Sequence, residues 1–294
     1  MSNTELHTDL RTAVRELCSR FPDSYWRELD AKEAYAEEFV KTLTDAGYLA
    51  ALIPEELGGS GLGISEASII LEEVNRSGGN SAACHAQMYT MGTILKHGSS
   101  EQKADWLPKV ASGKIRLQAF GVTEPTSGTD TLSLQTTAVK NDDHYVVNGQ
   151  KIWTSRAEHS DFMVLLARTT PKDKVKKKGE GLSVFMVDMR EALKDGMTIQ
   201  PVRTMMNHAT TEVFFDDVKV PVENLIGEEG KGFRYILDGM NAERTLIAAE
   251  CLGDAQWFIK KATDYASERK VFGSPIGKNP VSYTHLTLPT SDLV

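Results

Sequence analysis

The sequence predicts an α+β protein in which a helical region, a β region and a second helical region follow one another. Apolar residues recur at helical spacing before about residue 117 and again after residue 230, whereas short alternating runs separated by turns fill the middle. We expect an N-terminal helical domain over residues 1–117, a central antiparallel β-domain of sandwich or barrel type over residues 118–229, and the start of a C-terminal helical bundle over residues 230–279.

Helical periodicity is clearest in three stretches. Residues 31–46 carry Tyr35, Phe39, Leu43 and Ala46 at helical spacing, and Gly47 follows as a stop signal. Residues 65–76 repeat the pattern. After residue 230, one predicted apolar face comprises Phe233, Ile236, Leu237, Met240, Ile247, Ala248, Cys251, Leu252 and Ala255.

Strand patterns fill the central region. Residues 134–139 alternate, residues 141–143 predict a turn, and Asn148-Gly149 is a strong hairpin signal. Further strands are predicted over residues 152–154, 162–167, 182–187, 197–202 and 212–220.

Composition narrows the class of protein. The 294 residues carry a formal net charge of −8, which argues against nucleic-acid binding. No apolar run approaches the roughly 18 residues that cross a bilayer, and the N-terminus has no signal-peptide core. Cys18, Cys84 and Cys251 lack paired spacing, and the histidines are scattered, so we predict no metal site and a reducing, cytoplasmic location.

The last fifteen residues, PVSYTHLTLPTSDLV, fit neither the helical nor the strand pattern. Residues 280–294 resemble an in-frame translation of a sequencing adapter, so we interpret them as a non-native tail. The alternative is an unusual natural C-terminus.

Glu243 and Arg244 are candidates for catalysis because both fall on or beside the apolar stripe of the last helical region. Charged residues are rarely buried without a partner. Glu243 and Arg244 could therefore form a structural pair with each other, or both could lie exposed at a helix edge. Alternatively, they point into a cleft, where burial would raise the pKa of the carboxyl and suit Glu243 to act as a general base.

The β region offers a different kind of site. Trp153 supplies a flat surface, and hydroxyl residues lie near it in sequence or at neighbouring strand ends: Thr123, Thr126, Ser127, Thr129, Thr154 and Ser155. Such groups could bind the edge and face of a heteroaromatic ring. A Trp in a β-core, with hydroxyls capping turns, would give the same pattern.

Several motifs together identify a family. The chain contains PEELGGSG, FGVTEPTSGTD, VNGQKIWTS, FFDDVKVP, ENLIGEEGKGF, MNAERTLIAAE and SERKVFGSPIG in that order. From about Thr4 to Asn279 it resembles the acyl-CoA dehydrogenases. The resemblance implies an FAD flavoprotein that oxidises an acyl-CoA thioester to its trans-2-enoyl form and passes electrons to an electron-transfer flavoprotein, as a homodimer or homotetramer.

The resemblance also implies roles for particular residues. The expected cofactor-binding residues are Phe120, Val122, Thr123, Gly128, Thr129, Trp153, Thr154, Ser155 and Arg269, with Arg269 reaching the FAD of a neighbouring subunit. Ser155 stands where the family more often has Thr. Thr129, Asn241 and Arg244 are expected on the CoA side, with Asn241 where many members have Asp.

The catalytic base has two possible origins. Most members take a glutamate from late in the C-terminal domain, whereas others place it immediately before the CoA-side arginine, where Glu243 stands. We expect Glu243 to be the base; the alternative is a glutamate beyond this chain. An acyl-CoA oxidase or flavin monooxygenase of the same fold, or an inactive truncated fragment, are the other functional hypotheses.

Overall fold

The computed structural model describes residues 3–177, 179–206 and 208–282. The helices are α1 (Asn3–Cys18), α2 (Asp23–Ala31), α3 (Glu37–Asp45), α4 (Ile64–Arg76), α5 (Ala86–His97), α6 (Ser100–Ala111), α7 (Met189–Ala192) and α8 (Gly232–Glu268). The strands are β1 (Leu117–Gly121), β2 (Thr137–Asn141), β3 (His144–Ser155), β4 (Phe162–Arg168), β5 (Leu182–Asp188), β6 (Met197–Pro201), β7 (Thr210–Pro221), β8 (Leu225–Ile226), β9 (Lys270–Val271) and β10 (Ser274–Pro275). The predicted order of helical, β and helical regions is therefore confirmed.

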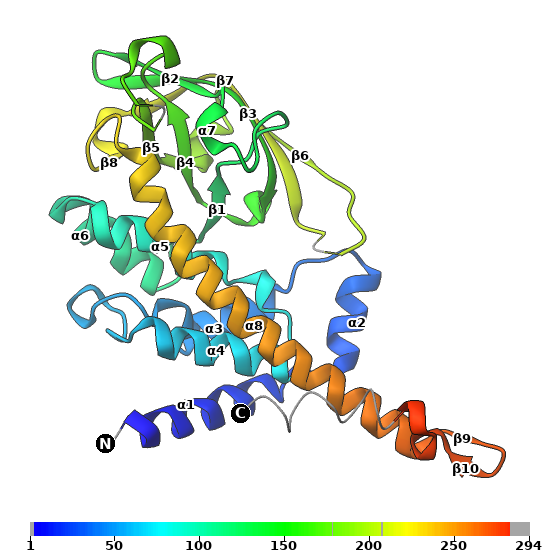
Figure 1. Cartoon of the computed structure of the whole chain (residues 1–294). Coiled ribbons are helices and arrows are strands. Elements are labelled where there is room, and N and C mark those ends of the chain that lie inside the picture. The colour runs from blue at the N-terminus through cyan, green and yellow to red at the C-terminus, as the bar shows by residue number, and fades with distance from the viewer. Residues whose placement is uncertain (1–2, 178, 207, 283–294) are drawn as a thin grey trace.

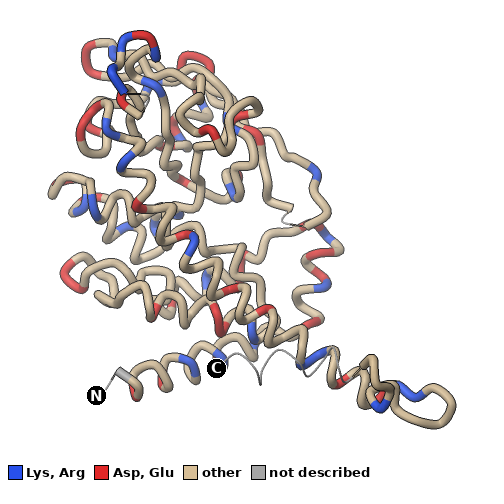
Figure 2. Tube along the Cα trace, viewed as in Figure 1, with Lys and Arg blue, Asp and Glu red and all other residues tan. Residues whose placement is uncertain are grey.

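Figure 1 shows the β region above the N-terminal helices, with α8 running obliquely beneath the sheet and past α5 and α4. The β9–β10 hairpin lies at the far end of α8, away from the sheet. Figure 2 shows acidic and basic residues interspersed along the trace.

The central sheet is mixed rather than wholly antiparallel. Seven strands run in the order β6-β7-β3-β2-β4-β5-β8, and β1 pairs with β4. The β1–β4 pairing is parallel, as is the single β2–β4 contact. The prediction of a purely antiparallel domain was wrong here because β1 enters directly from the helical region, whereas β4 is reached only after the β2–β3 hairpin. Alternation within a strand does not show which strand will lie beside it.

Strands β4 and β5 are buried on both faces. In β4, Phe162, Val164 and Leu166 face the core shared with the helices, and Met163 and Leu165 face the core on the other side of the sheet. Strand β5 divides its side chains in the same way. This explains why both strands are continuous apolar runs.

The Asn148-Gly149 signal does not form a hairpin. The turn between β2 and β3 lies at Asp142, whose φ is 50°, and β3 then continues through Gly149, opposite an extra residue in β7 that shifts the register of the two strands. The Asn148 side chain donates to Asp217 at 2.8 Å and accepts from its backbone at 2.9 Å. Residues 148–149 therefore lie within a strand, because β3 pairs with β7 on both sides of them.

The helix predicted over residues 31–46 forms only over its second part, as α3, and its first part is the connection from α2. Helix α2 ends at Ala31 and α3 begins at Glu37; between them Glu33 has a φ of 51°, which interrupts helical geometry. The predicted stop is confirmed, since α3 ends at Asp45 and Gly47 has a φ of 78°.

Helix α8 buries a different face from the one that its apolar pattern predicts. Met240 and Ile236 face the interior, but Ile247, Ala248, Cys251 and Leu252 are exposed. The helix instead packs its small residues against α4 and α5, where a Cβ at Gly253 would lie 2.2 Å from the Glu72 carbonyl oxygen. Close backbone contact, rather than the apolar stripe, decides the orientation in the second half of α8.

The predicted non-native tail lies mostly outside the described residues, which end at Ser282.

Candidate active site

A cavity of about 310 Å³ lies where the end of β3, the loop after β1, α5 and α8 meet. It brings together six residues predicted from the sequence: Phe120, Val122, Thr123, Trp153, Ser155 and Glu243. The other lining residues are Ala82, His85, Tyr89, Gln118, Ile152, Arg156 and Met240. We call it the central cavity. Its volume is at the lower end of the range for small-molecule sites.

A second irregularity in β3 places Trp153 at this cavity. The β3–β7 register shifts between Lys151 and Thr154, and Trp153 has a φ of 60°. Positive φ costs a bulky residue on the order of 1–3 kcal/mol and persists only where the surrounding structure enforces it. Trp153 is 57% exposed, so it does not pack in a β-core. The bulge therefore presents the ring to the cavity, which favours the binding interpretation over the core one.

A buried ion pair holds the loop beneath this ring. The Lys151 Nζ lies 2.8 Å from Glu124 Oε1 and donates to the Val122 carbonyl at 3.1 Å. Glu124 also accepts from the backbone N–H groups of Gln135 at 2.6 Å and Thr136 at 2.9 Å. Burial alone would raise the pKa of Glu124, but Lys151 and the hydrogen bonds from Gln135 and Thr136 together lower it below its usual value.

Sequence reasoning missed this pair. Lys151 is fully buried. It lies on the same side of β3 as the buried Tyr145 and Val147, so alternation along the strand points it inward. An inward lysine does not reveal, however, that Glu124, 27 residues earlier, will lie beside it.

Glu243 faces the central cavity from α8, one turn after Met240. Burial raises the pKa of its carboxyl, while the neighbouring Arg244 and Arg156 oppose the rise. A carboxyl with a raised pKa is a better proton acceptor once it is ionised, so the environment suits a general base.

Arg244 and Asn241 lie beside this carboxyl rather than in the central cavity. Both are exposed, and Arg244 Nη1 donates to Asn241 Oδ1 at 2.9 Å. Arg244 and Glu243 share a second, more open cavity with Met240, Ile247, Ala248 and Cys251. The expected neighbours are therefore paired, on the outer side of the proposed base.

Four other predicted residues do not line the central cavity. Gly128 and Thr129 are exposed in the loop after β1, and a Cβ at Gly128 would meet only the Thr123 side chain at 3.9 Å. Thr154 is buried in β3. Arg269 lies at the C-terminal end of α8, far from the sheet (Figure 1).

Two of the other lining residues, His85 and Arg156, carry ionisable side chains to which sequence reasoning assigned no role in the site. His85 Nδ1 lies 2.7 Å from Glu250 Oε1, and burial lowers the pKa of the imidazole despite this carboxylate. A histidine at the start of a buried helix gives no signal by itself.

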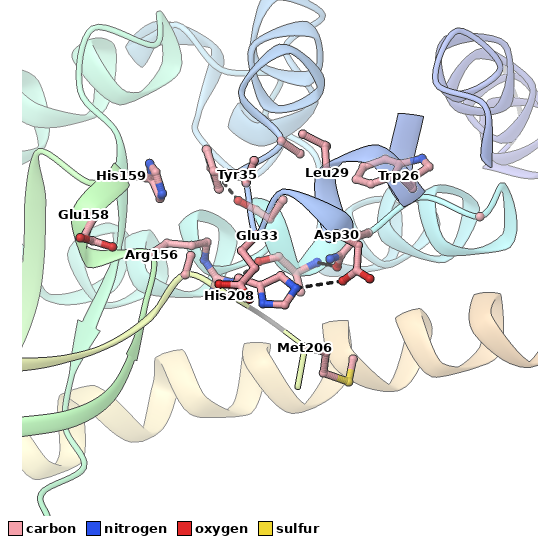
Figure 3. Close-up of a pocket in the computed structure, with 17 residues that line it drawn as sticks. Trp26, Leu29, Asp30, Glu33, Tyr35, Arg156, Glu158, His159, Met206 and His208 are labelled. Atoms are coloured by element: carbon pink, nitrogen blue, oxygen red, sulfur yellow. Dashed lines mark hydrogen bonds and ion pairs between the residues drawn. The ribbon is translucent and has the colours of Figure 1, made fainter. Parts of the chain in front are cut away.

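Arg156 also borders a neighbouring cavity of about 340 Å³, drawn in Figure 3. We call this the outer cavity. Figure 3 shows Arg156 and His208 on one side of it and Trp26 and Leu29 on the other, with His208 joined to Asp30 at 2.9 Å. Ala82 and Arg156 line both cavities and so form the wall between them.

The central cavity fits an isoalloxazine ring in its chemistry. Phe120, Val122 and Trp153 supply apolar and flat surfaces, and the hydroxyls of Thr123 and Ser155 can bond to polar atoms at the edge of a ring. No group of three or more potential metal ligands occurs among residues 3–282 as described.

Three family descriptions match successive parts of the chain: the acyl-CoA dehydrogenase N-terminal domain over residues 4–114, the middle domain over 119–218 and the C-terminal domain over 230–288. The chain belongs to the acyl-CoA dehydrogenase family. Members of this family are FAD-dependent oxidoreductases that act on CH–CH bonds.

Individual relatives agree. The chain is 34% identical to cyclohex-1-ene-1-carbonyl-CoA dehydrogenase of Syntrophus aciditrophicus, over 90% of this chain and 62% of that protein. It is 36% identical to glutaryl-CoA dehydrogenase of Desulfococcus multivorans, over 92% and 69%. It also superposes on a chain from the structure of the electron transferring flavoprotein of Acidaminococcus fermentans, with a TM-score of 0.88, 29% identity and coverage of 97% and 74%. The chain therefore spans roughly two thirds of the length of these acyl-CoA dehydrogenase relatives.

None of the described helices is both long enough and apolar enough to span a membrane.

Proposed function

We propose that this protein is an FAD-dependent acyl-CoA dehydrogenase that converts an acyl-CoA thioester to its trans-2-enoyl form, with Glu243 as the base. One observation carries the proposal: the half-buried carboxyl of Glu243 and the indole of Trp153 line the same cavity. Family membership supports the reaction class, and the alignment with relatives supports acyl-CoA as the substrate.

The side chains would divide the work as follows. Trp153 and Phe120 would bind the flat faces of the ring system, and Thr123 and Ser155 would bond to its edge. When bound, FAD would supply the acceptor for the hydride that leaves the β-carbon. Glu243 would remove the α-proton, which the thioester carbonyl makes acidic. Holding the base and the thioester in line is the main contribution of the protein.

The Lys151–Glu124 pair supports this geometry without touching the reactants. It holds the Val122 carbonyl, while the Ile152 N–H donates to the Thr123 carbonyl at 2.9 Å. The loop and the strand that carry the two sides of the ring site are therefore fixed to each other.

The remaining roles follow the family pattern. Gly128, Thr129 and Thr154 would lie along the cofactor outside the ring, and Thr129, Asn241 and Arg244 would bind the CoA part. Arg269, remote from this cavity, would reach the FAD of a second subunit in a homodimer or homotetramer. An electron-transfer flavoprotein would accept the electrons, in keeping with the structural similarity described above. A cytoplasmic location suits the three free cysteines.

Anaerobic addition of butyryl-CoA to the FAD-loaded chain tests the proposal. We expect the flavin absorbance to bleach without oxygen, and oxygen uptake to stay low when air is admitted. A chain that binds no flavin, or whose flavin stays oxidised with acyl-CoA thioesters of every length, would overturn it. Steady oxygen consumption would instead identify an oxidase.

A further inference from the structure

Arg156 is a buried cation without a carboxylate partner. The residue is only 2% exposed, and no acidic side chain lies within ion-pair distance of it in the described ranges. Its Nη1 donates to the Ala82 carbonyl, and its Nε has no hydrogen-bond partner among the described residues. The guanidinium also has a hydrogen bond with the neutral Tyr89 side chain, so no negative charge offsets the cost of taking this cation out of water.

A second buried arginine shows what a purely structural arrangement looks like in this chain. Arg168 is 7% exposed, and all three of its nitrogens donate to backbone carbonyls: Nε to Leu134 at 3.3 Å, Nη1 to Thr170 at 3.4 Å and Nη2 to Leu132 at 2.8 Å. Arg156 lacks this saturation. It also has a φ of 60°, so the backbone is held in a costly conformation that places this side chain between the two cavities.

The charges around the two cavities indicate where an anion would bind. The outer cavity already carries three carboxylate side chains, Asp30, Glu33 and Glu158, which would repel an anion (Figure 3). The central cavity carries one, Glu243, together with the neutral donors Tyr89 and Gln118. An anion paired with Arg156 is therefore favoured on the side of the central cavity.

We propose that Arg156 binds a carboxylate at the far end of the acyl group, so that the preferred substrates are CoA monothioesters of short dicarboxylic acids. This inference rests on the proposed function, because Glu243 defines where the α-carbon lies. Arginine suits the task because its planar guanidinium can bind a carboxylate through two parallel hydrogen bonds. The bound carboxylate would also supply the partner that the Nε lacks.

Isothermal titration of the FAD-loaded chain tests this without requiring turnover. Glutaryl-CoA and pentanoyl-CoA form a matched pair, because both acyl groups have five carbons and only one ends in a carboxylate. We expect the chain to bind glutaryl-CoA more tightly. Arg156→Gln should weaken glutaryl-CoA by about 10- to 100-fold and pentanoyl-CoA by less than about 3-fold. Arg156→Lys keeps the charge but not the two parallel bonds, so its affinity for glutaryl-CoA should lie between those of the unaltered chain and Arg156→Gln.

Arg190→Gln is the control for loss of a positive charge, since Arg190 pairs with Asp188 outside both cavities. It should leave both dissociation constants unchanged. The proposal is overturned if Arg156→Gln weakens both thioesters equally, if it releases FAD, or if the unaltered chain prefers pentanoyl-CoA. If Arg156→Gln fails to fold, the unaltered chain and Arg156→Lys still test the proposal. The unaltered chain should prefer glutaryl-CoA to pentanoyl-CoA, and Arg156→Lys should show a smaller preference. Failure of the proposed function looks different: neither thioester would bind and no flavin would be retained.

Discussion

Replacing Lys151 with Met tests whether the buried pair holds the ring-binding loop. Lys151 is fully buried, and its Nζ lies 2.8 Å from Glu124 Oε1. The substitution keeps a long unbranched side chain but leaves the Glu124 carboxylate buried without its cation. Its two backbone donors, the N–H groups of Gln135 and Thr136, remain.

The expected loss of stability follows from this geometry. At 2.8 Å and an effective dielectric constant of about 20, the attraction between the charges is roughly 6 kcal/mol, and desolvation of both groups offsets much of it. Removing one partner of a buried pair costs about 3–5 kcal/mol, because the other charge stays buried. We expect a loss of that size for Lys151→Met. The double variant Lys151→Met/Glu124→Gln should lose less than the two single losses added together, by on the order of 1–3 kcal/mol.

Urea denaturation followed by circular dichroism measures these changes. Lys194→Met is the matched control, since its Nζ lies 2.7 Å from Glu191 but both side chains are exposed, and it should cost less than about 1 kcal/mol. If Lys151→Met is as mild as this control, or if the double variant is strictly additive, the pair does not hold the loop.

Three further predictions follow from the fold and the cavity. Gly253→Ala should lower the free energy of unfolding by about 1–3 kcal/mol, because the added Cβ would lie 2.2 Å from the Glu72 carbonyl oxygen. Gly92→Ala is the control and should be neutral or slightly stabilising, since a Cβ there would have no atom within 4 Å. Equal effects of the two changes in urea denaturation would contradict the close α4–α8 contact. Trp153→Ala should weaken FAD binding about 5- to 100-fold, because aromatic contact with the ring is lost. Phe258→Ala, on the exposed side of α8, should leave FAD affinity unchanged. Fluorescence titration with FAD measures both dissociation constants. In the pH profile of kcat/KM, the rate should fall on the acid side at a pH above the ordinary glutamate pKa, because burial raises the pKa of Glu243. The base acts only when ionised, so the rate drops as the pH falls through the pKa of Glu243. A fall centred at or below about pH 4.3 would refute the assignment.

The sequence was sufficient for the parts of the fold that local patterns determine. The order of the three regions, the extent of α4, the stop at Gly47 and the strands β4 and β5 all follow from periodicity and turn residues. Pairings between distant segments were not predictable. The parallel β1–β4 contact and the bulge at Asn148-Gly149 depend on which strands become neighbours.

The residues of the candidate site also include some that the sequence predicts and some that it does not. Trp153, Ser155, Thr123 and Glu243 could be chosen from residue type, helix spacing and family motifs, and the structure places them around one cavity. The Lys151–Glu124 pair could not be chosen, because its two members lie 27 residues apart in the sequence. Arg156 could not be chosen either, because its placement depends on irregular backbone just after β3 and on a contact with the distant Ala82. The exposed side of α8 shows a further limit: an apolar stripe does not reveal which neighbour, if any, will cover it.

The most direct test of the central claim compares the chain with Glu243→Gln, a change that keeps the shape of the side chain but removes its capacity to accept a proton. Both proteins are loaded with FAD and mixed anaerobically with butyryl-CoA. We expect unchanged FAD affinity and a rate of flavin bleaching at least about 100-fold lower in the variant. Bleaching at the rate of the unaltered chain would show that the proton goes to a different group, and the assignment of Glu243 as the base would be wrong.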